Sequence, residues 1–286
     1  MSDQMKRRFQ LRYDPLQVFA DSKTPAGLYA RQKWRQEGKT HNWIHDFKEA
    51  VKTLRMDQLP DGSWGHSKSK TIQRLFSLHL TVREPDDAIR KGVDWLLCSD
   101  SQEHLPVTPC MGANMISNQA EDKIEDSSFR GLPFTNGCMN HLSICAALFL
   151  ANCFGLGEEK RITGLYDAIA REIEARDSHW YNIDCMNNAL RAFATHSRYA
   201  RSKSTAMMVN YLGQRQLPSG RWAGRVPFYL TFNALAHLNS ANAKRQCATA
   251  IENVLKTQNK DGSWGRSQKE WNTFLVVHAL NRLNAH

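Results

Sequence analysis

Asp61-Gly62-Ser63-Trp64-Gly65 recurs later in the chain as Asp261-Gly262-Ser263-Trp264-Gly265. A Gln stands three positions before each copy, at Gln58 and Gln258, and an altered third copy runs over 216–222. Asp-Gly favours a tight turn, because Gly accepts positive φ and Asp bonds nearby backbone groups. Each copy lies between two stretches whose apolar residues have helical spacing, which indicates a helical repeat protein.

The periodic stretches predict a fold without strands. Alternating β-branched runs are nearly absent, and good helix formers dominate. Residues 137–154 are apolar almost all round, which is typical of a buried helix. We therefore expect an all-α fold, an α/α toroid of about five helical hairpins with the apolar helices inside. The predicted helices span 43–56, 68–82, 85–98, 137–154, 158–175, 182–196, 203–214, 227–239, 243–257 and 268–283.

The toroid is expected to occupy 41–286 as one domain, after an N-terminal extension over 1–40. A long irregular segment at about 99–130 interrupts the second pair of helices. Loops of this length are usually functional or disordered, so the segment is interpreted either as a flexible surface loop or as a lid over a pocket. The Trp of each repeat would either line a ligand cavity or staple neighbouring hairpins, and the second interpretation is favoured.

The charge and composition of the chain limit which binding partners are expected. The net charge is +10, but the basic residues are scattered, so we expect no nucleic acid; a cavity for an anionic ligand such as a diphosphate explains the charge equally well. No apolar run approaches the ~20 residues of a transmembrane segment. The polar stretch 1–8 does not resemble a signal peptide. The seven cysteines show no CxxC, so reduced thiols and a cytoplasmic location are expected.

A second internal repeat carries candidate chemistry. Cys138-Met139-Asn140 recurs as Cys185-Met186-Asn187, 47 residues later, and would occupy equivalent places at the starts of adjacent inner helices. His141 follows one turn after Cys138, and Asp184 precedes Cys185. Cys138, His141, Asp184 and Cys185 are therefore a candidate zinc set. Close helix packing and a metal-free contact with a ligand remain alternative interpretations.

Other polar and aromatic side chains are expected at the same mouth of the toroid. Aromatic faces stabilise cations and Arg binds phosphate, although such residues also pack as ordinary rim residues. The candidates for substrate binding are Trp180, Tyr181, Arg225, Tyr229 and Trp271, beside Phe228 and Glu270.

The Gln…Gly-x-Trp repeats resemble those of the squalene/hopene cyclases and the protein prenyltransferase β subunits, over most of 43–283. Both families have an α/α toroid. In the prenyltransferases an Asp-Gly-Cys supplies two zinc ligands, where this chain has Asn136-Gly137-Cys138. The Arg that holds the diphosphate matches Arg130, but Asn182 replaces the family's His ligand. The resemblance therefore implies a zinc ion only if the candidate set of Cys138, His141, Asp184 and Cys185 replaces the missing family ligands. It implies magnesium if the substrate is a diphosphate.

The cyclases protonate an alkene or epoxide with an Asp-x-Asp-Asp motif, which this sequence lacks. Asp184 is the one aspartate at a predicted inner-helix start. The resemblance implies an isoprenoid-handling enzyme, by prenyl transfer or cyclisation, with Asp184, Cys138 and Cys185 as catalytic candidates and Arg130 on the diphosphate. The alternative is a non-catalytic toroid that binds a hydrophobic ligand or a helical partner subunit. A peptide- or carbohydrate-processing α/α barrel is a weaker alternative, because the Cys-His-Gly signature of the lanthipeptide cyclases, which are such barrels, is missing.

Overall fold

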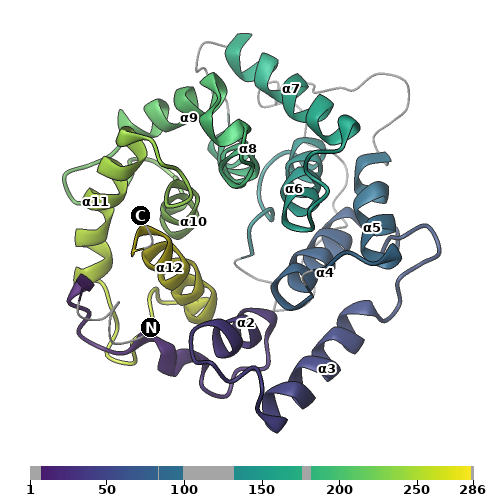
Figure 1. The fold of residues 1–286 in the computed structure, drawn as a ribbon. Helices are drawn as coiled ribbons and strands as arrows, with labels where there is room; N and C mark the ends of the chain where they lie inside the picture. The colour runs from purple at the N-terminus through teal and green to yellow at the C-terminus, as the bar shows by residue number, and fades with distance from the viewer. Residues whose placement is uncertain (1–7, 83, 99–131, 176–181, 285–286) are drawn as a thin grey trace. The chain divides into compact units, whose positions relative to one another are not determined.

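The computed structural model describes residues 8–82, 84–98, 132–175 and 182–284 (Figure 1). These ranges contain helices and no strands, so the all-α prediction is confirmed. Helices α3 to α12 match the ten predicted helices to within two residues at each end, except that α10 ends at Leu235 instead of 239. Three elements were not predicted, the 3-10 helices η1 (Pro15–Phe19) and η3 (Tyr199–Arg201) and helix α2 (Pro25–Lys33).

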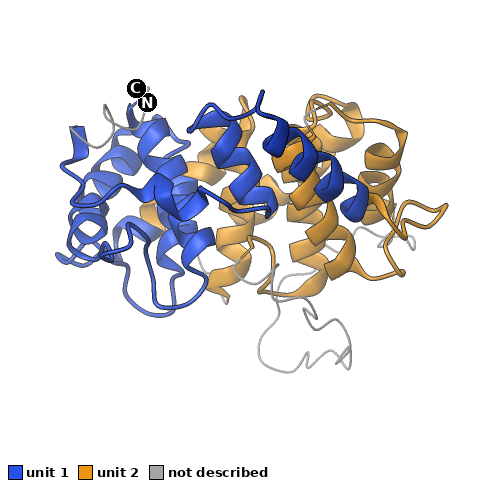
Figure 2. Ribbon diagram, turned by 90° about the horizontal axis from the view of Figure 1, so that it is seen from below, with its two compact units in different colours: residues 1–54, 212–286 blue, residues 55–211 orange. Residues whose placement is uncertain are grey.

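The chain divides into two compact units, coloured separately in Figure 2. Unit 2 spans residues 55–211, and within it α6 packs against both α4 and α8. The side chains of α6 from Leu142 to Ala151 are buried, as its apolar sequence predicts. The described elements of unit 2 are α4 (Lys68–Thr81), α5 (Asp87–Cys98), α6 (Met139–Cys153), α7 (Lys160–Ala175), α8 (Ile183–Thr195), η3 (Tyr199–Arg201) and most of α9 (Lys203–Gly213).

Unit 1 combines residues 1–54 with 212–286, and its helix α12 packs against α10, α2 and η1. The expected N-terminal extension thus supplies core residues, among them Leu28 of α2. Thr24 caps α2 and Pro25 begins it. The predicted boundary at residue 40 coincides with no unit limit and stays a prediction. The elements are η1 (Pro15–Phe19), α2 (Pro25–Lys33), α3 (His41–Arg55), α10 (Phe228–Leu235), α11 (Ala241–Lys256) and α12 (Lys269–Asn284).

The Gln of each repeat joins its own turn to a neighbouring element. The Gln58 side-chain amide donates to the carbonyl of Gly62 at 2.9 Å and to that of Ala88, on α5, at 2.8 Å. Gln216 donates in the same way to Gln246 on α11 at 2.8 Å, and Gln258 to Tyr13 at 3.0 Å. The Gln side chains therefore staple neighbouring hairpins together, a role that the sequence analysis gave to the Trp rings.

The Trp side chains of the repeats are buried in the protein. Trp64, Trp222 and Trp264 are at most 4% exposed. The Trp264 indole N–H donates to the carbonyl of Val254 at 2.8 Å, and that of Trp64 to Met56 at 3.1 Å. Each ring thus buries a large apolar surface while its single donor is satisfied. The repeat Trp residues therefore contribute to the core of the fold.

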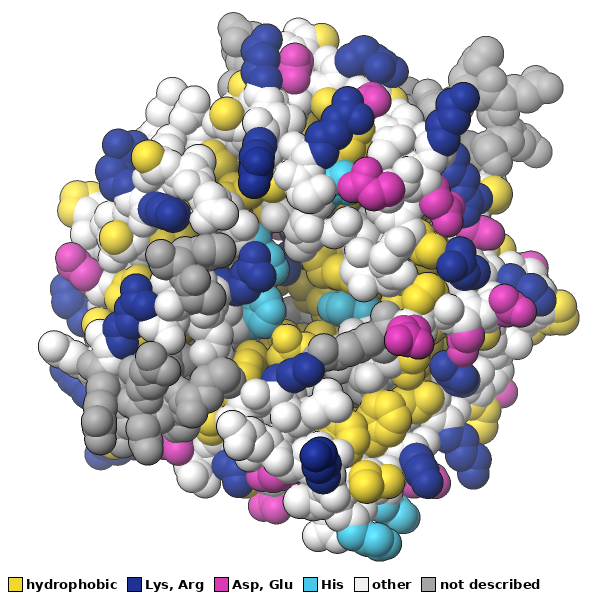
Figure 3. Space-filling model, viewed as in Figure 1, with side chains coloured by type: hydrophobic (Ala, Val, Ile, Leu, Met, Phe, Trp, Pro, Cys, Tyr) yellow, Lys and Arg dark blue, Asp and Glu magenta, His cyan; other side chains and the backbone are white. Residues whose placement is uncertain are grey.

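Charged side chains are intermingled on the face drawn in Figure 3, where Lys and Arg lie among acidic and other polar groups. This distribution fits the scattered basic residues of the sequence. No helix in the described ranges is long and apolar enough to span a membrane.

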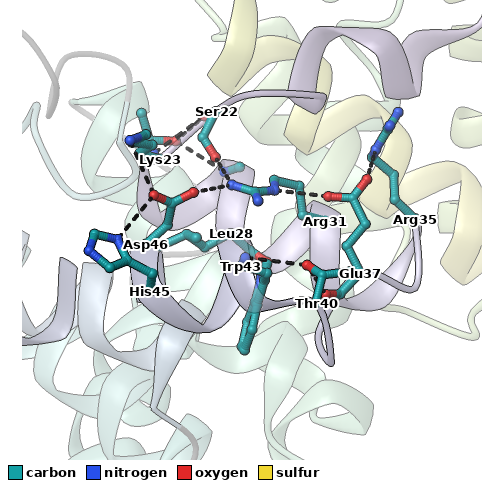
Figure 4. Close-up of polar contacts among 12 residues, drawn as sticks. Ser22, Lys23, Leu28, Arg31, Arg35, Glu37, Thr40, Trp43, His45 and Asp46 are labelled. Atoms are coloured by element: carbon teal, nitrogen blue, oxygen red, sulfur yellow. Dashed lines mark hydrogen bonds and ion pairs between the residues drawn. The ribbon is translucent and has the colours of Figure 1, made fainter. Parts of the chain in front are cut away.

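Arg31, which projects from α2, connects that helix to α3 and to the intervening turn (Figure 4). Its side chain is 6% exposed, and it lies 2.9 Å from Asp46 of α3 and 3.0 Å from Glu37. Trp43 strengthens the same junction by donating to the carbonyl of Leu28 at 3.0 Å. A buried Arg is stable here because two carboxylates satisfy it in a geometry that its planar fork fits.

Arg31→Met is expected to destabilise the protein by about 2 kcal/mol, because Asp46 and Glu37 would be left close together without their shared cation. Chemical denaturation measures this change. Lys23→Ala is the matched control, since Lys23 also pairs with Asp46 but is 74% exposed. The control should lose less than about 0.5 kcal/mol. Equal losses in the two variants would contradict the role given to Arg31.

The same junction makes stability sensitive to acid. The hydrogen bond from Arg31 lowers the pKa of Asp46 below its ordinary value of 3.8. A carboxylate of this kind stabilises the fold above its unfolded pKa, and the stabilisation is lost as the pH falls through the folded pKa. The difference in unfolding free energy between wild type and Asp46→Asn should therefore shrink below about pH 4. Denaturation curves over a pH series measure it, and a constant difference would contradict the assignment.

Candidate functional site

The starts of α6 and α8 lie side by side in unit 2. The Cys138 N–H donates to Cys185 Sγ at 3.3 Å, and Asn188 Nδ2 donates to the carbonyl of Asn136 at 2.8 Å. The predicted meeting of the two Cys-Met-Asn triplets is therefore confirmed. Gly137 allows this approach, because its φ is +120° and a Cβ there would lie 3.3 Å from Cys185 Sγ.

His141 faces backbone and thiol groups. Its Nε2 lies 3.0 Å from the carbonyl oxygen of Cys185 and 3.4 Å from Cys145 Sγ. A carbonyl oxygen can only accept, so this contact assigns the proton of the neutral ring to Nε2. In the described ranges, no three His, Cys, Asp or Glu side chains form a group that could hold a metal ion. Cys138, His141, Asp184 and Cys185 are thus not grouped around one point in the described structure, and the zinc site stays a prediction.

Asp184 lies in the first turn of α8. Its backbone N–H, like that of Cys185, donates to Oδ1 of the N-cap residue Asn182, at 2.8 and 3.2 Å. These are the donors that normally stabilise a carboxylate at a helix start, and Asn182 already uses them. Burial raises the pKa of Asp184. The side chain therefore keeps its proton at higher pH than an exposed Asp, which suits a general acid.

Aromatic rings from three elements meet within the same unit. The ring centroid of Phe149, on α6, lies 5.7 Å from that of Phe76 on α4 and 5.3 Å from that of Phe134, which precedes α6. All three side chains are at most 6% exposed. Phe134 stands two residues before Asn136, whose carbonyl accepts from Asn188 of α8. The segment that carries this ring is therefore held against the helix of Asp184.

The remaining candidate site residues lie either outside the described residues or in unit 1. Arg130, Trp180, Tyr181 and the 99–130 insertion lie outside the described residues. In unit 1, Arg225 is exposed just before α10, and burial raises the pKa of Tyr229. Trp271 is 7% exposed at the start of α12, with its ring centroid 5.5 Å from that of Phe274.

The sequence analysis missed two aromatic residues of unit 1 beside Trp271. Tyr29 and Trp34, from α2 and its end, have ring centroids 5.4 and 5.3 Å from that of Phe274. Together with Trp271 they form a continuous aromatic cluster on α12 and α2. The helix start at Thr24-Pro25 is the sequence signal that could have found them, because it places both rings on a helix instead of an extension.

Comparison with known proteins agrees with this architecture. Residues 179–279 match the family model of the squalene-hopene cyclase C-terminal domain. A variant of the type II terpene cyclase MstE from Scytonema, in complex with geranylgeranyl dihydroxybenzoate, is similar with a TM-score of 0.56 at 14% identity. The alignment covers 96% of this chain and 90% of that one. Residues 179–279 are therefore similar to that cyclase domain, and the likeness to MstE shows a shared fold.

Two further structures show the same fold. A protein from Actinoplanes has a TM-score of 0.56 at 15% identity, covering 92% of this chain and 89% of its own. Another MstE variant, in complex with merosterolic acid A, has a TM-score of 0.54 at 15% identity, covering 93% and 86%. The α/α toroid fold class of the terpenoid cyclases is thereby confirmed. No curated protein matches the sequence.

Proposed function

We propose that this chain is an isoprenoid-handling enzyme of the terpene-cyclisation type, with Asp184 as the acid that starts the reaction. The observation that carries this proposal is the environment of Asp184. It is a partly buried carboxyl with a raised pKa, and it lies within the segment that matches the squalene-hopene cyclase C-terminal domain. Perturbed carboxyl groups of this kind are concentrated at catalytic sites.

The proposed chemistry needs no redox step. Asp184 gives its proton to one carbon of a substrate double bond, which leaves a carbocation on the other carbon. Further double bonds of the chain attack in turn and close rings, and loss of a proton ends the sequence. Aromatic faces stabilise the intermediate cations, and the cluster of Phe76, Phe134 and Phe149 is the candidate for this role within the same unit.

A linear isoprenoid that keeps its head group is the proposed substrate class. The substrate in the MstE complex is a geranylgeranyl chain attached to an aromatic acid.

Prenyl transfer is less well supported, because the His141 nitrogen donates to a backbone carbonyl and the expected zinc set does not form among the described residues. The missing Asp-x-Asp-Asp motif instead favours a second candidate, a non-catalytic toroid that binds a hydrophobic ligand or a helical partner.

Product analysis separates these functions. The purified protein is incubated with geranylgeranyl-substituted aromatic acids, free polyprenyl alcohols and polyprenyl diphosphates, followed by chromatography and mass spectrometry. Cyclisation predicts products of unchanged mass with fewer double bonds. Release of diphosphate would instead indicate prenyl transfer. Ligand-induced thermal stabilisation without any turnover would support the binding protein.

A further inference from the structure

Cys138 and Cys185 are close enough for covalent chemistry with each other. The Cys138 amide nitrogen lies 3.3 Å from Cys185 Sγ. Since the N–Cα bond is about 1.5 Å, the Cα of Cys138 is at most about 4.8 Å from that sulfur. Cysteines joined by a disulfide have Cα atoms about 4.4–6.8 Å apart, and a Cα this close to the partner's sulfur is compatible with that range.

The backbone around the pair is held in place by independent contacts. Asn188 binds the carbonyl of Asn136 on one side of Cys138, and His141 binds the carbonyl of Cys185 on the other. These two contacts keep the backbone of Cys138 beside that of Cys185, so side-chain rotation is the movement that the bond would require. Neither of these contacts involves a sulfur, so both survive formation of the bond.

The thiols of Cys138 and Cys185 differ in their exposure to solvent. Cys138 is partly exposed at the N-cap of α6, where the partial positive charge of the helix start favours a thiolate. Cys185 is 3% exposed. Three other thiols are less suited to react: Cys145 is fully buried, and burial raises the pKa of Cys153 and Cys247 to about 12.

We propose that Cys138 and Cys185 form a reversible disulfide, with Cys138 as the attacking and Cys185 as the resolving thiol. The oxidant is a small disulfide such as glutathione disulfide. The Cys138 thiolate attacks one of its sulfur atoms, and one glutathione leaves as a thiolate and takes up a proton. The Cys185 sulfur then attacks Cys138 Sγ, loses its proton, and displaces the second glutathione. Two protein thiols are oxidised and one small disulfide is reduced.

The bond would fix the first turn of α8 against the start of α6. Asp184 immediately precedes Cys185, so the surroundings of the proposed acid would change with the redox state. This consequence for activity rests on the proposed function, whereas the disulfide itself does not.

Mass mapping of the native protein tests the proposal. After incubation of the wild type with glutathione disulfide, the peptides of Cys138 and Cys185 should together lose the mass of two hydrogen atoms, and digestion without reductant should yield them as a linked pair. Dithiothreitol should reverse both changes. Cys153→Ser, a change of another thiol on α6, should form the same bond.

Two variants test the order of attack. Cys185→Ser should accumulate glutathione on Cys138, because the resolving thiol is gone. Cys138→Ser should leave Cys185 unmodified, because that sulfur is buried. A stable glutathione adduct on Cys138 in the wild type would overturn the proposal, as would a link from Cys138 to Cys145 or no reaction at either thiol. The wild-type result decides the matter even if Cys185→Ser fails to fold.

Discussion

Asp184→Asn is expected to lower the rate of cyclisation by about a thousandfold, because general acid catalysis typically contributes 10²–10⁴-fold. Asparagine has nearly the shape of a protonated Asp but cannot give up a proton to an alkene. Substrate affinity, measured by thermal stabilisation with the same isoprenoid, should change little. Circular dichroism should confirm that the helical content is retained.

The rate of cyclisation by the wild type should also depend on pH in a defined direction. Burial raises the pKa of Asp184, and the reactive form is the protonated one. The rate should therefore be highest below this pKa and fall as the pH rises through it. The control is Asp87→Asn, which changes an exposed carboxyl in the first turn of α5. Loss of activity in both variants alike, or full activity of Asp184→Asn, would contradict the role of Asp184.

Gly262→Ala is expected to cost roughly 3 kcal/mol of unfolding free energy, a large effect for the addition of one methyl group. Gly262 has φ +83°, a conformation that L-residues adopt only with strain. A Cβ at this position would lie 2.4 Å from the carbonyl oxygen of Asp14, which is backbone and cannot rotate away. The repeat turn would have to separate from the segment that Gln258 binds at Tyr13.

Gly224→Ala is the matched control in the same unit. Its φ is +75°, but no atom lies within 4 Å of the position that a methyl group would take, so only the backbone strain of about 1 kcal/mol applies. Denaturant unfolding of both variants separates strain from close approach. Equal destabilisation would show that the contact with Asp14 is unimportant, and the account of the repeat as a staple would then fail for this copy.

The regular part of the fold was predictable because apolar residues with helical spacing recur along the chain and three repeat copies mark turns between helices. Helix α2 was not predictable in the same way. It is only nine residues long, it contains Gly27, and it buries the charged Arg31, which in a sequence reads as a surface residue. Its place depends on Asp46 and Glu37, whose pairing with Arg31 no local pattern reveals.

Only part of the candidate site could likewise be predicted from the sequence. The spacing of 47 residues correctly predicted that Cys138 and Cys185 meet, because equivalent repeat positions are neighbours. The expected zinc set stays a prediction, and the sequence could not show that His141 Nε2 faces the backbone carbonyl of Cys185. The raised pKa of Asp184 was also beyond sequence reasoning, since an Asp in the first turn of a helix is ordinarily exposed and stabilised as an anion.

Solvent isotope incorporation tests the central claim most directly. The protein is equilibrated in deuterium oxide, where the Asp184 carboxyl exchanges its proton, and is then given a geranylgeranyl-substituted aromatic acid. Proton-initiated cyclisation predicts one deuterium in each product molecule, at the carbon that accepts the proton, and no such product from Asp184→Asn. A cyclised or transferred product without deuterium, or one accompanied by free diphosphate, would contradict it.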